Sequence, residues 1–159
     1  MPFLALVLAW LVPGAGHYYV GRKVRGVVIF LTLSAMFWTG VALGGVMTVD
    51  ARGERWWFVA DMFTGVHGLV SYQRQKAVYA DPKIFPPQEA MLLQNEAVVD
   101  ERLAKAGIVL AHPGDTVART YAGIAGFLNL MCMFDAVMLA LMGQVGEPSS
   151  QKEEKGGPP

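Results

Sequence analysis

Long apolar stretches separated by polar segments dominate this chain, and their lengths predict helices. The four stretches are residues 3–20, 24–49, 56–72 and 120–146. A helix needs roughly 20 apolar residues to cross the hydrocarbon core of a bilayer, which is about 30 Å thick. The second and fourth stretches are long enough, and Asp135 is the only Lys, Arg, Asp or Glu within residues 26–49 and 120–146. We therefore expect both to be membrane-spanning helices.

The first and third stretches are less regular. Pro13 and Gly14 interrupt the first, and because proline lacks a backbone donor, a helix is expected to break or kink there. The third has 17 residues, near the short limit for a crossing, and contains Asp61 and His67. Trp56 at its start suits the aromatic belt of a membrane surface. The whole pattern predicts an all-α, polytopic helical membrane protein with three to four transmembrane helices.

A polar stretch follows the third apolar segment, and its first residues include prolines that stop a helix. Residues 88–106 are then expected to be helical, with an apolar stripe of Leu92, Val99, Leu103 and Ala106. The stripe is expected to lie on the membrane surface or on the rest of the protein, or the helix is an ordinary solvated surface helix. The predicted organisation is N-terminal membrane helices (residues 1–72), a polar loop (73–119), a C-terminal membrane helix (120–146) and a disordered tail without hydrophobic residues (147–159).

Composition agrees with a membrane protein. The chain is 53% hydrophobic and 16% charged, whereas a soluble domain usually carries about 25% charged residues. Its formal net charge is zero, so we expect no nucleic-acid partner. Residues 3–12 have the length of a signal-peptide core, but no basic residue precedes them and no Ala-x-Ala site follows, so we expect no cleavage. The single cysteine, Cys132, is expected to be a packing residue.

Basic residues near helix ends predict the orientation in the membrane. With four crossings, six basic residues fall on the side of the long loop and four on the other, namely Arg22, Lys23, Arg25, Arg74, Lys76 and Arg119 against Arg52, Arg55, Lys152 and Lys155. We therefore predict a cytoplasmic loop with both termini outside. A three-crossing chain would place its two termini on opposite sides.

The segment around residues 13–26 is the most distinctive part of the chain. It reads Pro-Gly-Ala-Gly-His-Tyr-Tyr-Val-Gly-Arg from Pro13, followed by Arg25-Gly26. Glycines permit tight turns, His and Tyr suit the headgroup region, and Arg can pair with lipid phosphates. The predicted interfacial motif consists of Gly14, Gly16, His17, Tyr19, Gly21, Arg22 and Arg25.

This motif resembles the opening of the TM-two domain family, whose paired membrane helices carry a Gly-x-x-His-x-Phe-Tyr-x-Gly core. More closely, the chain is similar to a family of uncharacterised bacterial membrane proteins of planctomycete type, in this first block and in Thr120–Leu130 followed by Asp135-Ala136. The resemblance implies a multi-pass protein of the bacterial cytoplasmic (inner) membrane and no particular activity. Because Tyr18-Tyr19 departs from the TM-two order, binding roles of eukaryotic TM-two proteins are not carried over.

Polar residues inside the apolar stretches form a second set of candidates. An ionisable group within a span costs about 2.5–3.5 kcal/mol and usually faces protein or water. Asn129 and Asp135 are six residues apart, which places them roughly 120° apart around a helix. They are therefore expected to contact different neighbours, either as hydrogen-bonding contacts between helices or, for Asp135, in proton or ion handling. Asp61 is a third candidate, and it too is six residues from a polar partner, His67.

Small residues four apart allow close helix packing, and Gly40, Gly44, Ala122 and Gly126 have this spacing. No His-x-x-x-His, Cys-x-x-Cys, Gly-x-Ser-x-Gly or phosphate-binding glycine loop is present. We therefore predict no cofactor and no catalytic residue. A metal site that gathers His17, His67 and Asp135 is the weaker alternative.

Three functions follow from these observations, in order of preference. The first is a non-enzymatic membrane scaffold or complex subunit, in contact with the bilayer, that associates with itself or with another membrane protein. The second is a small transporter or a proton- or ion-coupled component that uses Asp135, with Asn129 and Asp61. The third is an enzyme that acts on lipids at residues 17–25.

Overall fold

The computed structural model describes residues 1–49, 55–108, 115–144 and 146, and every regular element within them is a helix. The elements are α1 (Pro2–Leu11), α2 (Ala15–Tyr19), α3 (Lys23–Gly44), η1 (Gly45–Thr48), α4 (Arg55–Met62), α5 (Val66–Tyr79), η2 (Pro87–Gln94), α6 (Glu96–Lys105) and α7 (Asp115–Leu141). For these residues the predicted all-α class is confirmed. The predicted disordered tail, residues 147–159, lies outside the described residues.

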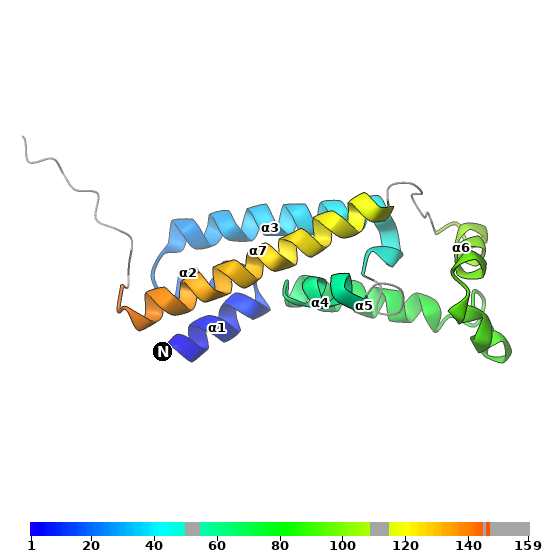
Figure 1. The fold of residues 1–159 in the computed structure, drawn as a ribbon, viewed down its shortest axis with the longest axis horizontal. Helices are drawn as coiled ribbons and strands as arrows, with labels where there is room; N and C mark the ends of the chain where they lie inside the picture. The colour runs from blue at the N-terminus through cyan, green and yellow to red at the C-terminus, as the bar shows by residue number, and fades with distance from the viewer. Residues whose placement is uncertain (50–54, 109–114, 145, 147–159) are drawn as a thin grey trace, which may run out of the picture.

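Two antiparallel helices, α3 and α7, run the length of the main bundle (Figure 1). Among the described helices, these two are long and apolar enough to cross a membrane, over 22 and 26 residues. At 1.5 Å per residue they measure about 33 and 39 Å. The prediction of three to four crossings is therefore too high, because α1 has ten residues and α4 has eight, and neither reaches across a bilayer.

The first apolar stretch forms a hairpin of half the bundle's length instead of a crossing. Helix α1 runs from the left end of the bundle to its middle, and the short α2 turns back (Figure 1). The helix breaks at Pro13-Gly14, as the sequence predicted, but the chain also reverses there, which the sequence did not predict. Gly14 has a φ of +82° that side chains rarely tolerate. A Cβ atom at Gly14 would also meet the carbonyl of Gly26 on α3. Both the backbone conformation and the close contact therefore require glycine.

The third apolar stretch is not the single helix expected over residues 56–72. It breaks after Met62, and α5 then returns toward the end from which α4 came (Figure 1). Gly65 at the break has a φ of +61°. The Thr64 hydroxyl donates to the Asp61 carbonyl at 2.6 Å and accepts from the Gly68 amide at 3.0 Å. The side chain thus replaces backbone bonds that the break removes, and α4–α5 is a second half-length hairpin.

Small residues bring these elements together around α7. Gly40 lies against Ala118 and Ala122, where a Cβ atom would come within 2.7 Å of the Ala118 carbonyl oxygen. Gly44 faces Ala118, and Gly126 faces the backbone carbonyl of Ala60 on α4. All four predicted packing positions are therefore used within the chain, which leaves them unavailable for contacts with a partner.

The long polar loop builds a separate end unit, residues 80–108, that projects across the right-hand end of the bundle (Figure 1). The single helix expected over residues 88–106 is divided into η2 and α6, because the Asn95 side chain caps α6 by accepting from the Ala97 amide at 3.2 Å. Val99 and Leu103 pack on Phe85. At Val99 and Leu103, the predicted stripe therefore faces other residues of the loop. Ala106 is exposed. The side chain of Leu92 lies outside the described residues.

The structure also corrects the predicted grouping of basic residues. Arg22 and Arg25 lie at the start of α3, at the left end of the bundle, whereas α5, which carries Arg74 and Lys76, runs to the right end (Figure 1). The prediction placed all four on one side because it counted the first and third stretches as full crossings. Since each turns back halfway, the two groups lie at opposite ends.

Candidate functional site

The tips of the two hairpins meet at the middle of α7, and Asn129 joins them. Its Nδ2 donates to the carbonyl of Ala9 in α1 at 3.0 Å and to the carbonyl of Phe63, just after α4, at 2.8 Å. Trp10 adds a direct link, because its Nε1 donates to the Met62 carbonyl at 3.1 Å. The last carbonyls of a helix lack intrahelical partners, so Asn129 supplies donors for the Ala9 and Phe63 carbonyls. The Met62 carbonyl accepts from Trp10 in addition to the Gly65 amide.

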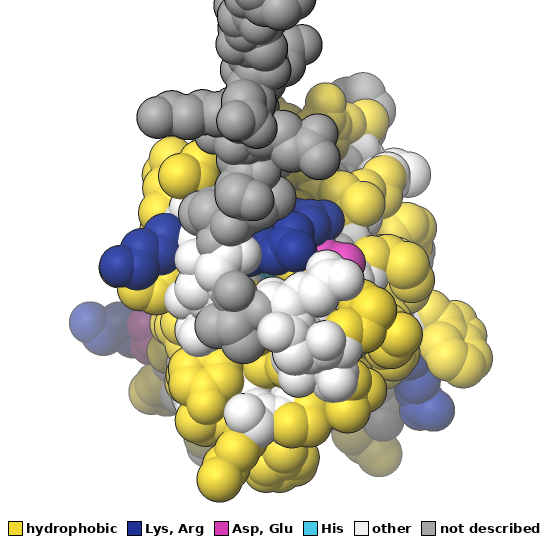
Figure 2. Space-filling view, turned by 90° about the vertical axis from the view of Figure 1, so that its left-hand side faces the viewer, with side chains coloured by type: hydrophobic (Ala, Val, Ile, Leu, Met, Phe, Trp, Pro, Cys, Tyr) yellow, Lys and Arg dark blue, Asp and Glu magenta, His cyan; other side chains and the backbone are white. Residues whose placement is uncertain are grey.

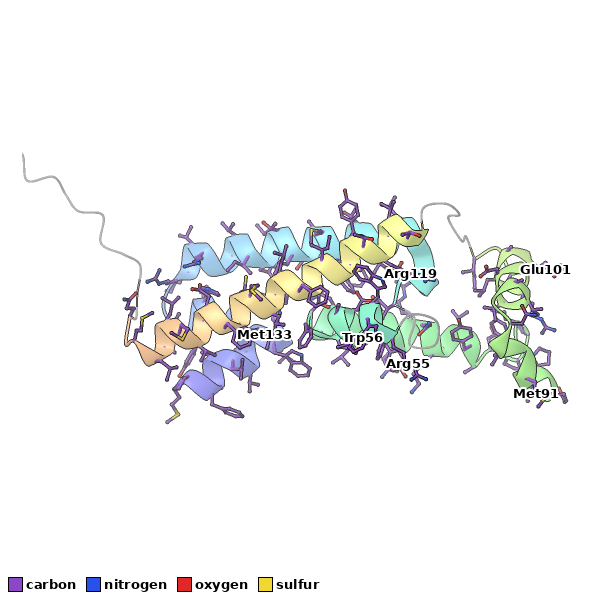
Figure 3. All side chains as sticks on the ribbon, viewed as in Figure 1. Arg55, Trp56, Met91, Glu101, Arg119 and Met133 are labelled. Atoms are coloured by element: carbon purple, nitrogen blue, oxygen red, sulfur yellow. The ribbon has the colours of Figure 1, made fainter. Side chains whose placement is uncertain are left out.

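Asp61 lies beside this junction and is the least satisfied polar group in the described part of the bundle. Its exposed fraction is 0%, and neither carboxylate oxygen has a hydrogen-bond partner among the described residues. Arg119 on α7 interacts with it electrostatically, and Figure 3 shows Arg119 extending from α7 toward the layer of α4 and α5. Ala60, next to Asp61, packs on Gly126, two residues from the centre of α7.

Helix α5 presents a buried polar face that the sequence reading missed. His67, Ser71 and Gln75 are four residues apart and are 9%, 6% and 2% exposed. The His67 Nε2 and the Ser34 Oγ on α3 share a hydrogen bond at 3.0 Å, and the ring of Phe37 packs on the imidazole. The spacing i, i+4, i+8 was a usable signal, but it crosses the predicted end of the third stretch at residue 72.

His17 and Asp135 form a second polar site at the left end of the bundle. The His17 Nε2 donates to the Asp135 Oδ2 at 2.8 Å, and Arg25 forms an ion pair with the same oxygen at 2.9 Å. Figure 2 looks at this end and shows basic side chains beside a carboxylate, surrounded by hydrophobic side chains. Asn129 and Asp135 thus contact different neighbours, as their spacing predicted.

The predicted headgroup role of His17 is wrong, because its exposed fraction is 0%. The imidazole is enclosed between α2 and α7, where it meets Asp135. Tyr19 is 42% exposed, and so remains available at the surface. Arg22 donates to the Gln144 side chain at 3.3 Å.

The glycines of the motif serve the fold. Gly16 packs against α1 and α7, where a Cβ atom would come within 2.6 Å of both the Ala5 carbonyl oxygen and the Ala9 Cβ. Gly21 has a φ of +87° at the turn into α3. Of the seven predicted interfacial residues, Gly14, Gly16 and His17 are therefore packed inside the protein.

The structure separates the residues of the alternative metal site. His17 and Asp135 meet at one end, while His67 bonds to Ser34 on α3. In the described part of the chain, no group of three or more His, Cys, Asp or Glu residues could hold a metal ion.

We expect the pair of His17 and Asp135 to contribute more stability than the pair of Arg25 and Asp135. The His17 side chain is 1% exposed and the Arg25 side chain 48%, so water screens the second pair more strongly. Double-mutant cycles with alanine, measured as free energies of unfolding in detergent, should give a coupling of about 1–2 kcal/mol for the first pair and below about 1 kcal/mol for the second. The reverse order would contradict the burial of His17.

Comparison with known proteins adds one match. The model of a family of unknown function, DUF6677, matches residues 4–149, a range that includes both hairpins, the end unit and both long helices. This agrees with the prediction of a family of unknown function, while the planctomycete origin and the TM-two likeness stay predictions. No curated protein and no solved structure matches the chain.

Proposed function

The chain belongs to the DUF6677 family, whose function is unknown, and we propose that it is a small, non-enzymatic integral membrane protein that serves as a subunit or scaffold of a larger membrane assembly. In this proposal α3 and α7 cross the bilayer. The hairpins α1–α2 and α4–α5 enter it from opposite sides, and their tips meet near its centre.

The exposed apolar surface of the two long helices carries the proposal. In the apolar, membrane-spanning part of each helix, only 22% of α3 and 33% of α7 are buried inside the protein. The core helix of a soluble protein would be mostly buried. Large exposed apolar surfaces mark contacts with lipid or with other proteins. Exposed side chains on these helices include Val28, Leu31, Phe127, Met131, Phe134 and Leu141.

The junction of the hairpins also supports a location in lipid. Non-helical backbone is tolerated at membrane depth only where protein surrounds it or water reaches it. The donors from Asn129 and Trp10 meet this requirement for the carbonyls of Ala9, Met62 and Phe63.

We further propose that the end unit lies in the cytoplasm and that the membrane is the bacterial cytoplasmic membrane. Among the described residues, seven Lys and Arg lie toward the end unit and three lie at the opposite end, namely Arg55, Arg74, Lys76, Lys83, Arg102, Lys105 and Arg119 against Arg22, Lys23 and Arg25. An excess of basic residues favours the cytoplasmic side.

The end unit is the surface that we propose for a partner. The small-residue faces of α3 and α7 are already filled within the chain, so association through them is not expected. Met91 on η2, in contrast, is 86% exposed and lies at the far tip of the end unit (Figure 3). Among the described side chains of the end unit, Met91 is the large hydrophobic group that is exposed instead of packed in the unit's own core, so we propose it as the point of contact with another protein.

Photocrosslinking in native membranes tests this proposal. After an alkaline wash, the chain should stay in the membrane pellet, and a photoreactive amino acid at Met91 should give one discrete species of higher mass. The same probe at Glu101, on another side of the end unit (Figure 3), is the matched control and should give little product. A chain in the supernatant would contradict the membrane location, and equal yields at both positions would contradict the partner surface.

A second function, a proton- or ion-coupled component, is favoured by one observation. Its original candidate was Asp135, but His17 and Arg25 already pair with that carboxylate. Asp61, in contrast, is buried without a hydrogen-bond partner among the described residues. Within this second function, we therefore propose Asp61 instead of Asp135 as the proton- or ion-binding group.

A further inference from the structure

We propose that Asp61 is a proton-binding site at the centre of the membrane, which exchanges its proton with the side of the end unit. This inference deepens the second function and rests on the proposed membrane location. It is independent of the partner surface on the end unit.

The two membrane aspartates of the bundle have opposite surroundings. Asp135 is 39% exposed and receives a hydrogen bond from His17 and an ion pair from Arg25. Asp61 is fully enclosed, and neither of its oxygens accepts a hydrogen bond from a described residue. An enclosed carboxylate without donors costs far more free energy to bury than the neutral acid does. Asp61 is therefore suited to bind a proton, whereas Asp135 pairs with the side chains of His17 and Arg25.

The position of Asp61 on its helix favours the neutral acid as well. It occupies the last turn of α4 (Arg55–Met62), where the helix dipole is negative and disfavours an anion. The Thr64 hydroxyl that could have reached its side chain is bonded to the Asp61 backbone carbonyl and the Gly68 amide. Neighbouring donors are thus committed to the backbone at the break.

Among the described residues of α5 and α7, which pack on α4, one charged side chain acts as a counter-ion for Asp61. From α7, Arg119 interacts with it electrostatically. From α5, His67 is bonded to Ser34 on α3, and the Tyr72 ring packs on Phe58. Arg119 therefore stabilises the anion that forms when Asp61 releases its proton, so both states of the carboxyl are accessible.

A buried polar face on α5 extends from the level of Asp61 in the bundle toward the end unit. On α5, which packs on α4, Ser71 and Gln75 are buried between the hairpin tip and the loop. The Ser71 Oγ has no hydrogen-bond partner among the described residues. Arg119 lies in the half of α7 nearest the end unit (Figure 3). The opposite half of the bundle has the paired His17 and Asp135 instead, so we assign the proton's entry to the end-unit side.

The chemical step is a reversible protonation. A proton from water adds to a carboxylate oxygen of Asp61 and forms one O–H bond, and the same bond breaks on release. Dicyclohexylcarbodiimide, an apolar reagent, detects the protonated form in membranes. The carboxyl oxygen bonds to the carbodiimide carbon, the acid proton moves to a carbodiimide nitrogen, and the adduct rearranges to a stable N-acylurea without a leaving group.

The test is carried out on the full chain in washed native membranes, with the modified residue mapped by mass spectrometry of peptides. We expect the wild-type chain to carry the adduct on Asp61, at least tenfold above Asp135, and to lose it as the pH is raised. Asp61→Asn should abolish the adduct, and the matched variant Asp135→Asn should retain it. Mapping on the wild-type chain keeps the test valid if a variant does not accumulate.

Three results distinguish the possible failures. An adduct on Asp135 or on loop carboxylates, with none on Asp61, would overturn the proton site while leaving the membrane function intact. Labelling of Asp61 that does not change with pH would also overturn it. A chain found in the supernatant before labelling would instead contradict the membrane location on which the inference rests.

Discussion

Replacing Asn129 by alanine should lower the free energy of unfolding by about 2 kcal/mol or more. A buried polar group left without its partner costs about 1–3 kcal/mol, and this substitution removes the donor of both the Ala9 and Phe63 carbonyls. Hydrogen bonds between membrane helices average only about 0.6 kcal/mol in double-mutant cycles. We expect a larger effect because the Ala9 and Phe63 carbonyls lie where helices end. No intrahelical amide can replace the Asn129 donor there.

The measurement is unfolding of the purified chain in mixed micelles, followed by tryptophan fluorescence. Leu128→Ala is the matched control, because it shortens a neighbouring side chain of α7 that is 44% exposed, and surface substitutions usually change stability by less than about 0.5 kcal/mol. If both variants lose the same stability, Asn129 does not hold the hairpin tips together.

Replacing Gly126 by alanine should detach α4 from α7. The added Cβ atom would run into the backbone carbonyl of Ala60, and a backbone carbonyl cannot rotate away as a side chain can. Overpacking of this kind costs about 1–3 kcal/mol, and α4 must move as a unit to relieve it. Alanine is the better helix former by about 1 kcal/mol, so a net loss of stability would reflect packing.

Gly123→Ala provides the matched control, one turn earlier on the same helix. Its Cβ atom would meet the indole ring of Trp57, which can turn aside. In the same unfolding assay we expect this variant to lie close to the wild type and Gly126→Ala to fall well below it. Equal stability of the two variants would mean that α4 does not dock on α7 as described.

Features that depend on neighbouring residues could be read from the sequence. The lengths of the apolar runs predicted α3 and α7, because a helix of about 20 apolar residues needs no other part of the chain to define it. The break at Pro13-Gly14 was also readable, since proline and glycine act on their own backbone. The six-residue spacing of Asn129 and Asp135 placed them correctly on different faces, because it depends on helix geometry alone.

Features that depend on distant residues became visible in the folded chain. The third stretch looked like a short crossing, and its reversal near Gly65 is stabilised by Asn129, which is 66 residues from its partner Phe63. His17 looked like a headgroup anchor until Asp135, 118 residues away, was found beside it. Apolar length measures how well a segment dissolves in lipid, and donors elsewhere in the fold determine whether it can turn back there.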